Sequence, residues 1–136
     1  MKKLLIVLTL LSFNLYAETV PFIKVVDGDT IETKFASLPI GLQKVYIRIS
    51  GIDTGETNYL AKCQKEKDSG NLAAARVRQL LIGIKEVEIL APKWDKYGGR
   101  FDAGVLVNGI NIGNTLLAEG LAKPYYGTGP KPNWCN

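Results

Sequence analysis

The strongest structural signal in this chain is the segment FIKVVDGDTIET at residues 22–33. Apolar and polar side chains alternate on both sides of a central Asp-Gly-Asp, which is typical of two half-buried strands joined by a tight turn. A second alternating run, KVYIRI at residues 44–49, follows after a loop that contains proline and glycine. The segment therefore predicts a β-hairpin, with a third strand directly after it.

Helical spacing begins later in the chain. Apolar residues recur every three or four positions over 71–84, with Ser69 or Asn71 as the N-cap and Gly83 at the end. The polar segment before them, residues 59–68, is expected to be a loop. These features predict one long helix.

Two further strands are expected at 87–90 and 101–107, then a short second helix at 114–119 and an irregular tail from residue 124. Five strands with a long helix between the third and the fourth form the element order of an OB-type barrel. We therefore expect a β-rich α+β fold: a five-stranded OB-fold barrel with one long helix between strands 3 and 4 and a short second helix.

The amino terminus has the three-part pattern of a secretory signal peptide at residues 1–17. Two lysines precede an apolar run at 4–11, and Leu15-Tyr16-Ala17 precedes the expected cleavage point. A membrane anchor is the alternative, but the apolar run is too short to span a bilayer. We expect a domain over residues 18–136, located in the periplasm or secreted, without stable membrane association after cleavage.

Composition removes several function classes. The chain has 136 residues and no histidine, which excludes a histidine base, a Ser-His-Asp triad and a Cys-His zinc site. Removing residues 1–17 takes away two lysines and no acid, so the formal charge falls from +4 to +2. This charge is too small to indicate nucleic-acid binding by itself. Nothing in the sequence requires more than a monomer.

Cys63 and Cys135 are the two cysteines of the sequence. In an exported chain an even number of cysteines favours a disulfide, although two unrelated thiols remain the alternative. We expect a bond that ties the carboxyl-terminal tail to the segment around Cys63.

Three acids follow apolar strands: Asp29, Asp53 and Glu56. Carboxylates gathered at one end of a sheet provide the oxygen ligands that calcium prefers. An aspartate in a turn is also ordinary turn chemistry, and this is our interpretation of Asp27. Without histidine, Glu56 is the best placed of these residues to act as a base.

Two arginines complete a chemical pattern that neither they nor the acids form alone. Arg48 lies on the third expected strand, and Arg100 follows a loop with two glycines. Each alone is ordinary on a surface, but a guanidinium can bind two phosphate oxygens at once. Together with a metal and a carboxylate base, such groups can hydrolyse a phosphodiester.

Three ordered motifs carry a family resemblance: VDGDT at 26–30, Arg48 followed by Asp53-Thr54 and Glu56, and DKYG at 95–98 leading to Arg100. Between about residues 20 and 126 the chain resembles the staphylococcal nuclease (thermonuclease) family. The resemblance implies an OB-fold barrel and calcium-dependent endonucleolytic cleavage of DNA and RNA.

The resemblance also implies a role for each matching residue. Calcium (Ca²⁺) would be bound by Asp29, Asp53 and the backbone carbonyl of Thr54. The catalytic residues would be Arg48, Glu56 and Arg100. The substrate would contact Lys96, Tyr97 and Tyr126, with Tyr125 as the less secure match. The family usually has proline where this chain has Gly55, so we expect Glu56 to be held less rigidly. Gly99 adds one residue before Arg100, so we expect either that a bulged loop brings Arg100 to the site or that Arg100 points elsewhere.

The leading hypothesis is a secreted or periplasmic calcium-dependent endonuclease that acts on DNA and RNA with little sequence specificity. The alternative is a catalytically weak OB-fold module that binds single-stranded nucleic acid. An oligosaccharide-binding or interaction domain on the same barrel is a third class, and it would not need clustered acids. The joint presence of Arg48, Glu56 and Arg100 favours the nuclease.

Overall fold

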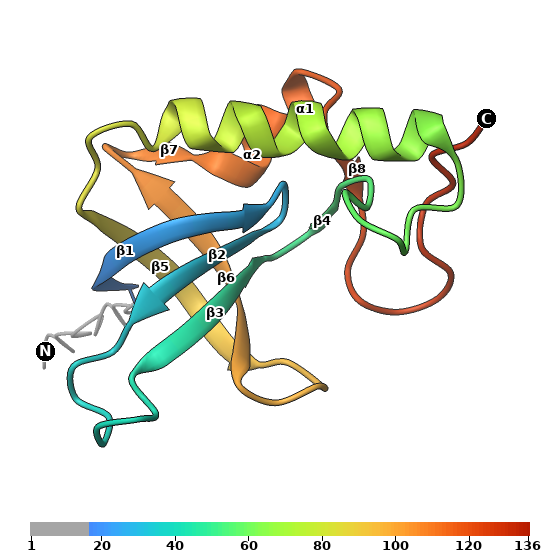
Figure 1. Ribbon diagram of the computed structural model, residues 1–136. Coiled ribbons are helices and arrows are strands. Elements are labelled where there is room, and N and C mark those ends of the chain that lie inside the picture. Colours follow the sequence, from blue (N-terminus) through green and yellow to red (C-terminus); the bar gives the residue numbers. More distant parts are fainter. Residues whose placement is uncertain (1–16) are drawn as a thin grey trace, which may run out of the picture.

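The computed structural model describes residues 17–136, so the predicted signal peptide lies outside the described residues except for Ala17. Five long strands form a closed barrel (Figure 1). They are β1 (Ala17–Asp27), β2 (Thr30–Lys34), β3 (Lys44–Ile49), β5 (Glu86–Trp94) and β6 (Arg100–Val107). The strands follow the order β3-β2-β1-β5-β6, and a parallel pairing between β3 and β6 closes the barrel. The predicted OB-fold is confirmed.

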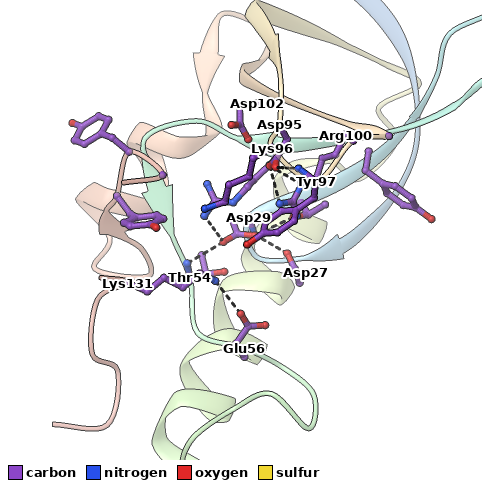
Figure 2. Close-up of a pocket in the computed structure, with 18 of the residues that line it drawn as sticks. Asp27, Asp29, Thr54, Glu56, Asp95, Lys96, Tyr97, Arg100, Asp102 and Lys131 are labelled. Atoms are coloured by element: carbon purple, nitrogen blue, oxygen red, sulfur yellow. Dashed lines mark hydrogen bonds and ion pairs between the residues drawn. The ribbon is translucent and has the colours of Figure 1, made fainter. Parts of the chain in front are cut away.

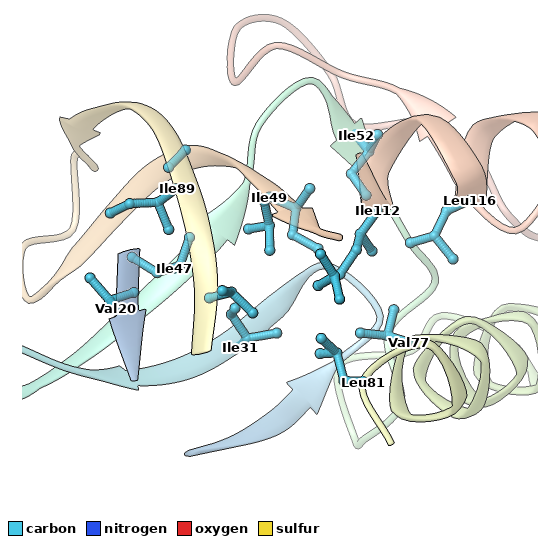
Figure 3. Packing of buried hydrophobic residues seen from close by; sticks show 14 of the residues in the cluster. Val20, Ile31, Ile47, Ile49, Ile52, Val77, Leu81, Ile89, Ile112 and Leu116 are labelled. Atoms are coloured by element: carbon cyan, nitrogen blue, oxygen red, sulfur yellow. The ribbon is translucent and has the colours of Figure 1, made fainter. Parts of the chain in front are cut away.

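Strand β3 shows most clearly how alternation separates a packed interior from the exterior, whereas residues 30–33 of β2 are all buried. On β3, Val45, Ile47 and Ile49 are buried, whereas Tyr46 and Arg48 lie on the other face. The interior is filled mainly by β-branched and other aliphatic side chains from all five strands and both helices (Figure 3). Because β-branched residues favour strands and pack well on a pleated surface, the same residues form the strands and fill the core.

The long helix α1 (Gln64–Leu80) lies between β3 and β5, as predicted, but its limits differ from the expected ones. It begins seven residues before Asn71, and residues 64–68 are helix and not loop. Cys63 is the N-cap, and its Sγ accepts a hydrogen bond from the Glu66 backbone nitrogen at 3.3 Å. The first turns are polar and mostly exposed, so they carry no apolar period that would reveal a helix.

The shorter elements refine the carboxyl-terminal half. Helix α2 (Ile112–Ala118) begins two residues earlier than predicted, and β7 (Ile110–Asn111) precedes it. The tail is not irregular from its start, because β8 (Lys123–Pro124) pairs with β4 (Ile52–Asp53). Strand β1 also begins five residues before the predicted hairpin, and its first half pairs with β5. Within residues 17–136, no helix is long and apolar enough to cross a membrane.

Cys63 and Cys135 form the predicted disulfide, with Cα atoms 6.0 Å apart. Figure 1 shows the carboxyl terminus beside the first turn of α1. The bond therefore fixes the end of the tail to the helix whose N-cap is Cys63.

Candidate active site

A cleft of about 760 Å³ opens between the β1–β2 turn, β3, the loop after β4, the β5–β6 loop and the tail (Figure 2). It brings together most of the residues predicted from the sequence: Asp29, Arg48, Thr54, Glu56, Lys96, Tyr97, Arg100 and Tyr126. Asp53 does not line the cleft wall but contacts two of the cations that face it. The β-hairpin, the third strand and two distant loops thus converge on one site.

Arg48 bridges the two aspartates predicted to bind a cation. Its Nη2 atom lies 3.7 Å from Asp29 Oδ2 and 3.7 Å from Asp53 Oδ1. Asp29 is held by its neighbours, since Oδ1 accepts from the Thr30 hydroxyl and Oδ2 accepts from the Thr54 backbone nitrogen. The Asp29 and Asp53 carboxylates therefore both lie beside the same guanidinium nitrogen, Nη2 of Arg48.

Buried polar atoms at this point lack hydrogen bonds. Among residues 17–136, Asp53 Oδ1 and Arg48 Nη2 are buried atoms without a hydrogen-bond partner. In the same part of the chain, no three Asp, Glu, Cys or His side chains come close enough together to form a metal site by themselves. Any cation here would need two carboxylates completed by backbone oxygens and water.

Asp27 stabilises the β1–β2 turn, as expected of an aspartate at that position. Its carboxylate accepts a hydrogen bond from the Asp29 backbone nitrogen at 3.1 Å. Burial, reinforced by the negative charge of Asp29, raises the pKa of Asp27 to about 7. Asp27 is therefore only partly ionised at neutral pH.

Glu56 is paired with a residue that the sequence did not point to. Lys131, in the tail, places its Nζ atom 3.2 Å from Glu56 Oε1 and 3.4 Å from Asp53 Oδ1. Although burial lowers the pKa of Lys131, these two carboxylates outweigh burial and hold the pKa above its usual value. Figure 2 shows Lys131 beside Thr54 and Glu56, on the tail side of the cleft.

Gly55, in the loop that carries Glu56, packs closely against α1. A Cβ atom on Gly55 would lie 2.3 Å from the backbone oxygen of Glu66, and one on Gly70 would lie 2.2 Å from the oxygen of Gly55. In this chain the loop and α1 thus approach so closely that a Cβ atom at either position would clash with backbone. Packing against α1 restricts the backbone next to Glu56, and it offsets the conformational freedom of glycine.

Arg100, the first residue of β6, reaches the cleft directly after the β5–β6 loop, despite the additional glycine. Gly98 and Gly99 both have positive φ angles, 69° and 61°, which form a turn that favours glycine. Arg100 donates from Nε to Asp95 Oδ2 at 2.9 Å, and its Cζ atom lies 5.6 Å from the centre of the Tyr97 ring. The loop therefore presents a guanidinium that is already oriented by a carboxylate.

The pKa values of the neighbouring acids Asp95 and Asp102 are shifted in opposite directions. Burial raises the pKa of Asp95, but the Tyr97 backbone nitrogen and the Arg100 guanidinium together lower it below its usual value. Burial and the negative charge of Asp95 raise the pKa of Asp102. Asp95 is therefore the carboxylate that keeps its charge and holds Arg100.

The predicted substrate contacts lie on two sides of the cleft. Lys96 Nζ lies 5.3 Å from the centre of the Tyr97 ring, on the loop that precedes Arg100. Tyr126 is exposed, while the Tyr125 ring lies 5.7 Å from Arg48 Cζ. Tyr126 thus presents an exposed ring to the cleft, whereas Tyr125 packs against Arg48.

Sequence reasoning also missed Trp134. Its indole Nε1 donates to Asp53 Oδ2 at 2.9 Å, and both side chains are buried. No local pattern relates these residues, because they stand 81 positions apart.

Carboxylates and arginines meet in one cleft of this OB-fold barrel. Because the same barrel carries many different functions, the class of protein has to be argued from the site and from similar proteins. A family model of staphylococcal nuclease homologues matches residues 46–133. The match covers most of the described chain and includes Arg48, Asp53, Glu56 and Arg100. The chain belongs to the staphylococcal nuclease homologue family.

Proposed function

We propose that this protein is a calcium-dependent endonuclease that hydrolyses phosphodiester bonds of DNA and RNA with little sequence specificity. The observation that carries the proposal is the position of Arg48 Nη2, 3.7 Å from both Asp29 and Asp53, in the same cleft as Glu56 and Arg100. Carboxylates, a base and guanidinium groups are the components that phosphodiester hydrolysis requires.

The donor set fits a hard cation better than any other metal. The oxygens of Asp29 and Asp53, with the Thr54 backbone carbonyl and water, provide the ligand type that Ca²⁺ binds in irregular geometry. The buried Oδ1 of Asp53, which lies beside Arg48 and Lys131 but accepts no hydrogen bond from the described residues, supports this assignment. When bound, the ion would supply positive charge to the phosphate oxygens.

The residues of the chain would perform the remaining steps. Arg48 and Arg100 would bind the non-bridging phosphate oxygens and stabilise the negative charge of the transition state. The Glu56 carboxylate would accept a proton from the attacking water. Lys96 and Tyr97 would contact a neighbouring phosphate, and Tyr126 would stack on a base without selecting its identity.

We further propose that the protein is monomeric and acts in the periplasm or outside the cell. The disulfide supports this location, since such bonds persist in oxidising compartments. The signal peptide predicted at residues 1–17 points to the same location, with no stable membrane association after its cleavage.

One observation favours the alternative, an OB-fold module that binds single-stranded nucleic acid without cutting it. In this structure Glu56 forms an ion pair with Lys131, and Arg100 forms an ion pair with Asp95. A base that stays in an ion pair does not accept a proton from water.

The two functions are separated by incubating supercoiled plasmid and single-stranded RNA with calcium or with a chelator. We expect cleavage only with calcium, and a decrease of about 10²–10⁴-fold in Glu56→Gln. Glu88→Gln, an equal charge change at an exposed position on β5, should cut like the wild type. Nucleic-acid binding without cleavage under any divalent metal would refute the nuclease and support the binding module.

A further inference from the structure

The carboxyl-terminal tail reaches into the acidic side of the site through Trp134. The hydrogen bond from its indole Nε1 to Asp53 Oδ2 is 2.9 Å long, and the two residues are 7% and 2% exposed. A hydrogen bond between a neutral donor and an ionised acceptor is strong when both groups are shielded from water. The contact therefore restricts the rotation of the Asp53 carboxylate.

The orientation of that carboxylate decides where its second oxygen lies. With Oδ2 held by the indole, Oδ1 faces Arg48 at 3.7 Å and Lys131 at 3.4 Å. Within residues 17–136, this Oδ1 accepts no hydrogen bond although it is buried. The indole thus holds one oxygen of Asp53 and turns the other, which accepts no hydrogen bond within the described part of the chain, toward the positively charged side of the cleft, where a bound cation would share it with Arg48 and Lys131.

The tail that carries Trp134 is fixed at the next residue. Cys135 is bonded to Cys63, the N-cap of α1, and Figure 1 shows the tail ending beside that helix. On the other side, Lys123 Nζ lies 4.6 Å from the centre of the indole ring and donates to the Asn133 backbone oxygen at 2.6 Å. The indole is therefore held from both ends of the segment.

We propose that Trp134 is a positioning residue for divalent-cation binding, acting through Asp53. The inference rests on the proposed function, since it takes Asp53 to be a cation ligand. Hydrogen bonds to metal-binding carboxylates set their orientation, and their loss typically weakens metal affinity by about 10- to 100-fold. Trp134 does not itself touch the substrate or the cation.

The test measures the calcium dissociation constant by titration calorimetry, without substrate, for the wild type and for Trp134→Phe. A second variant carries benzothienylalanine at position 134, which keeps the shape of the indole but replaces its N–H by sulfur. We expect both variants to bind calcium about 10- to 100-fold more weakly. Trp94→Phe is the matched control, because Trp94 is exposed and packs on Phe101 at 4.3 Å. It should bind like the wild type.

A second readout needs neither calcium nor activity, and it applies even if Trp134→Phe fails to fold. In a ¹H–¹⁵N spectrum of the metal-free protein, the indole resonance of Trp134 should exchange slowly with water and shift in Asp53→Asn. The resonance of Trp94 should do neither. An indole signal of Trp134 that is insensitive to Asp53 would refute the proposal.

The outcomes separate this inference from the proposed function. Calcium affinities that agree within twofold between the wild type and the benzothienylalanine variant would refute the role of Trp134 alone. Calcium binding that depends on Trp134, without any cleavage of nucleic acid, would support that role and refute the nuclease. A wild-type protein that binds no calcium would refute both.

Discussion

Removing the Cys63–Cys135 disulfide should destabilise this domain by about 4 kcal/mol. The bond closes a loop with a sequence separation of 72 residues. In the chain-entropy model, a loop of this length restricts the unfolded chain by about 15 cal/mol/K, or about 4 kcal/mol at 25 °C. This is a large share of the roughly 5–15 kcal/mol that stabilises a typical domain.

Serine is the appropriate replacement at Cys63, because the sulfur atom has a second function. It caps α1 by accepting a hydrogen bond from the Glu66 backbone nitrogen. A serine hydroxyl preserves this cap, whereas alanine would add about 1 kcal/mol of unrelated destabilisation. The double variant Cys63→Ser/Cys135→Ser therefore isolates the effect of the covalent bond.

The measurement is urea unfolding followed by circular dichroism, together with a thermal scan. For a domain of this size, about 4 kcal/mol corresponds to a decrease in Tm of roughly 15 °C. The reduced wild type should match the double variant and serves as its control. A double variant within about 1 kcal/mol of the oxidised protein would show that the tail docks without the bond, and the entropic reasoning would be wrong.

Three further predictions concern single side chains. Gly55→Ala should destabilise the domain by about 1–3 kcal/mol, seen in urea unfolding, because its Cβ would lie 2.3 Å from a backbone oxygen of α1; an unchanged midpoint would contradict the close packing. Lys131→Met should tighten calcium binding by about 2- to 5-fold at low salt, since it removes a half-exposed cation beside Asp53 and Glu56; weaker binding by calorimetry would contradict this competition. Asp102→Asn should raise stability at neutral pH, because the folded protein raises the pKa of Asp102 and so disfavours its charged form. The gain should vanish below pH 3.8, the usual value, where Asp102 is protonated in both states; a gain that persists in acid would refute the electrostatic origin.

The barrel could be predicted from the sequence because its strands depend on a local rule. Residues 44–49 alternate between apolar and polar side chains, and the structure places Val45, Ile47 and Ile49 in the core as that alternation requires. The hairpin segment follows the rule less regularly, since residues 30–33 of β2 are all buried. The start of α1 escaped prediction because its first turns are solvated and capped by a cysteine, an unusual N-cap residue. A helix that buries few side chains at its beginning leaves no period to detect.

The residues of the site that belong to the three sequence motifs could be predicted. The residues that the carboxyl-terminal tail contributes could not. The acids and arginines of the three motifs meet in one cleft, as expected from their positions after strands and in loops. Lys131 and Trp134 lie in a segment without regular structure, so no periodicity marks them as functional. Their position depends on a disulfide to a residue 72 positions away. Likewise, the need for glycine at position 55 arises from contact with α1 and not from the loop sequence.

The charges around Arg48 indicate why the proposed reaction requires a metal ion, although two positively charged side chains, Arg48 and Lys131, are already present. Asp29, Asp53 and Glu56 contribute three negative charges, and Arg48 and Lys131, each within 3.7 Å of two of these acids, contribute two positive charges. One negative charge remains, and it repels a phosphodiester, which is itself an anion. A divalent ion would reverse the local charge to +1, so the phosphate would be attracted and the bound complex would be near neutral. Histidine would be a poor substitute, because its charge would vary with pH in the physiological range. The cluster around Arg48 contains no imidazole, so binding of a divalent cation is the event that would reverse the sign of its charge.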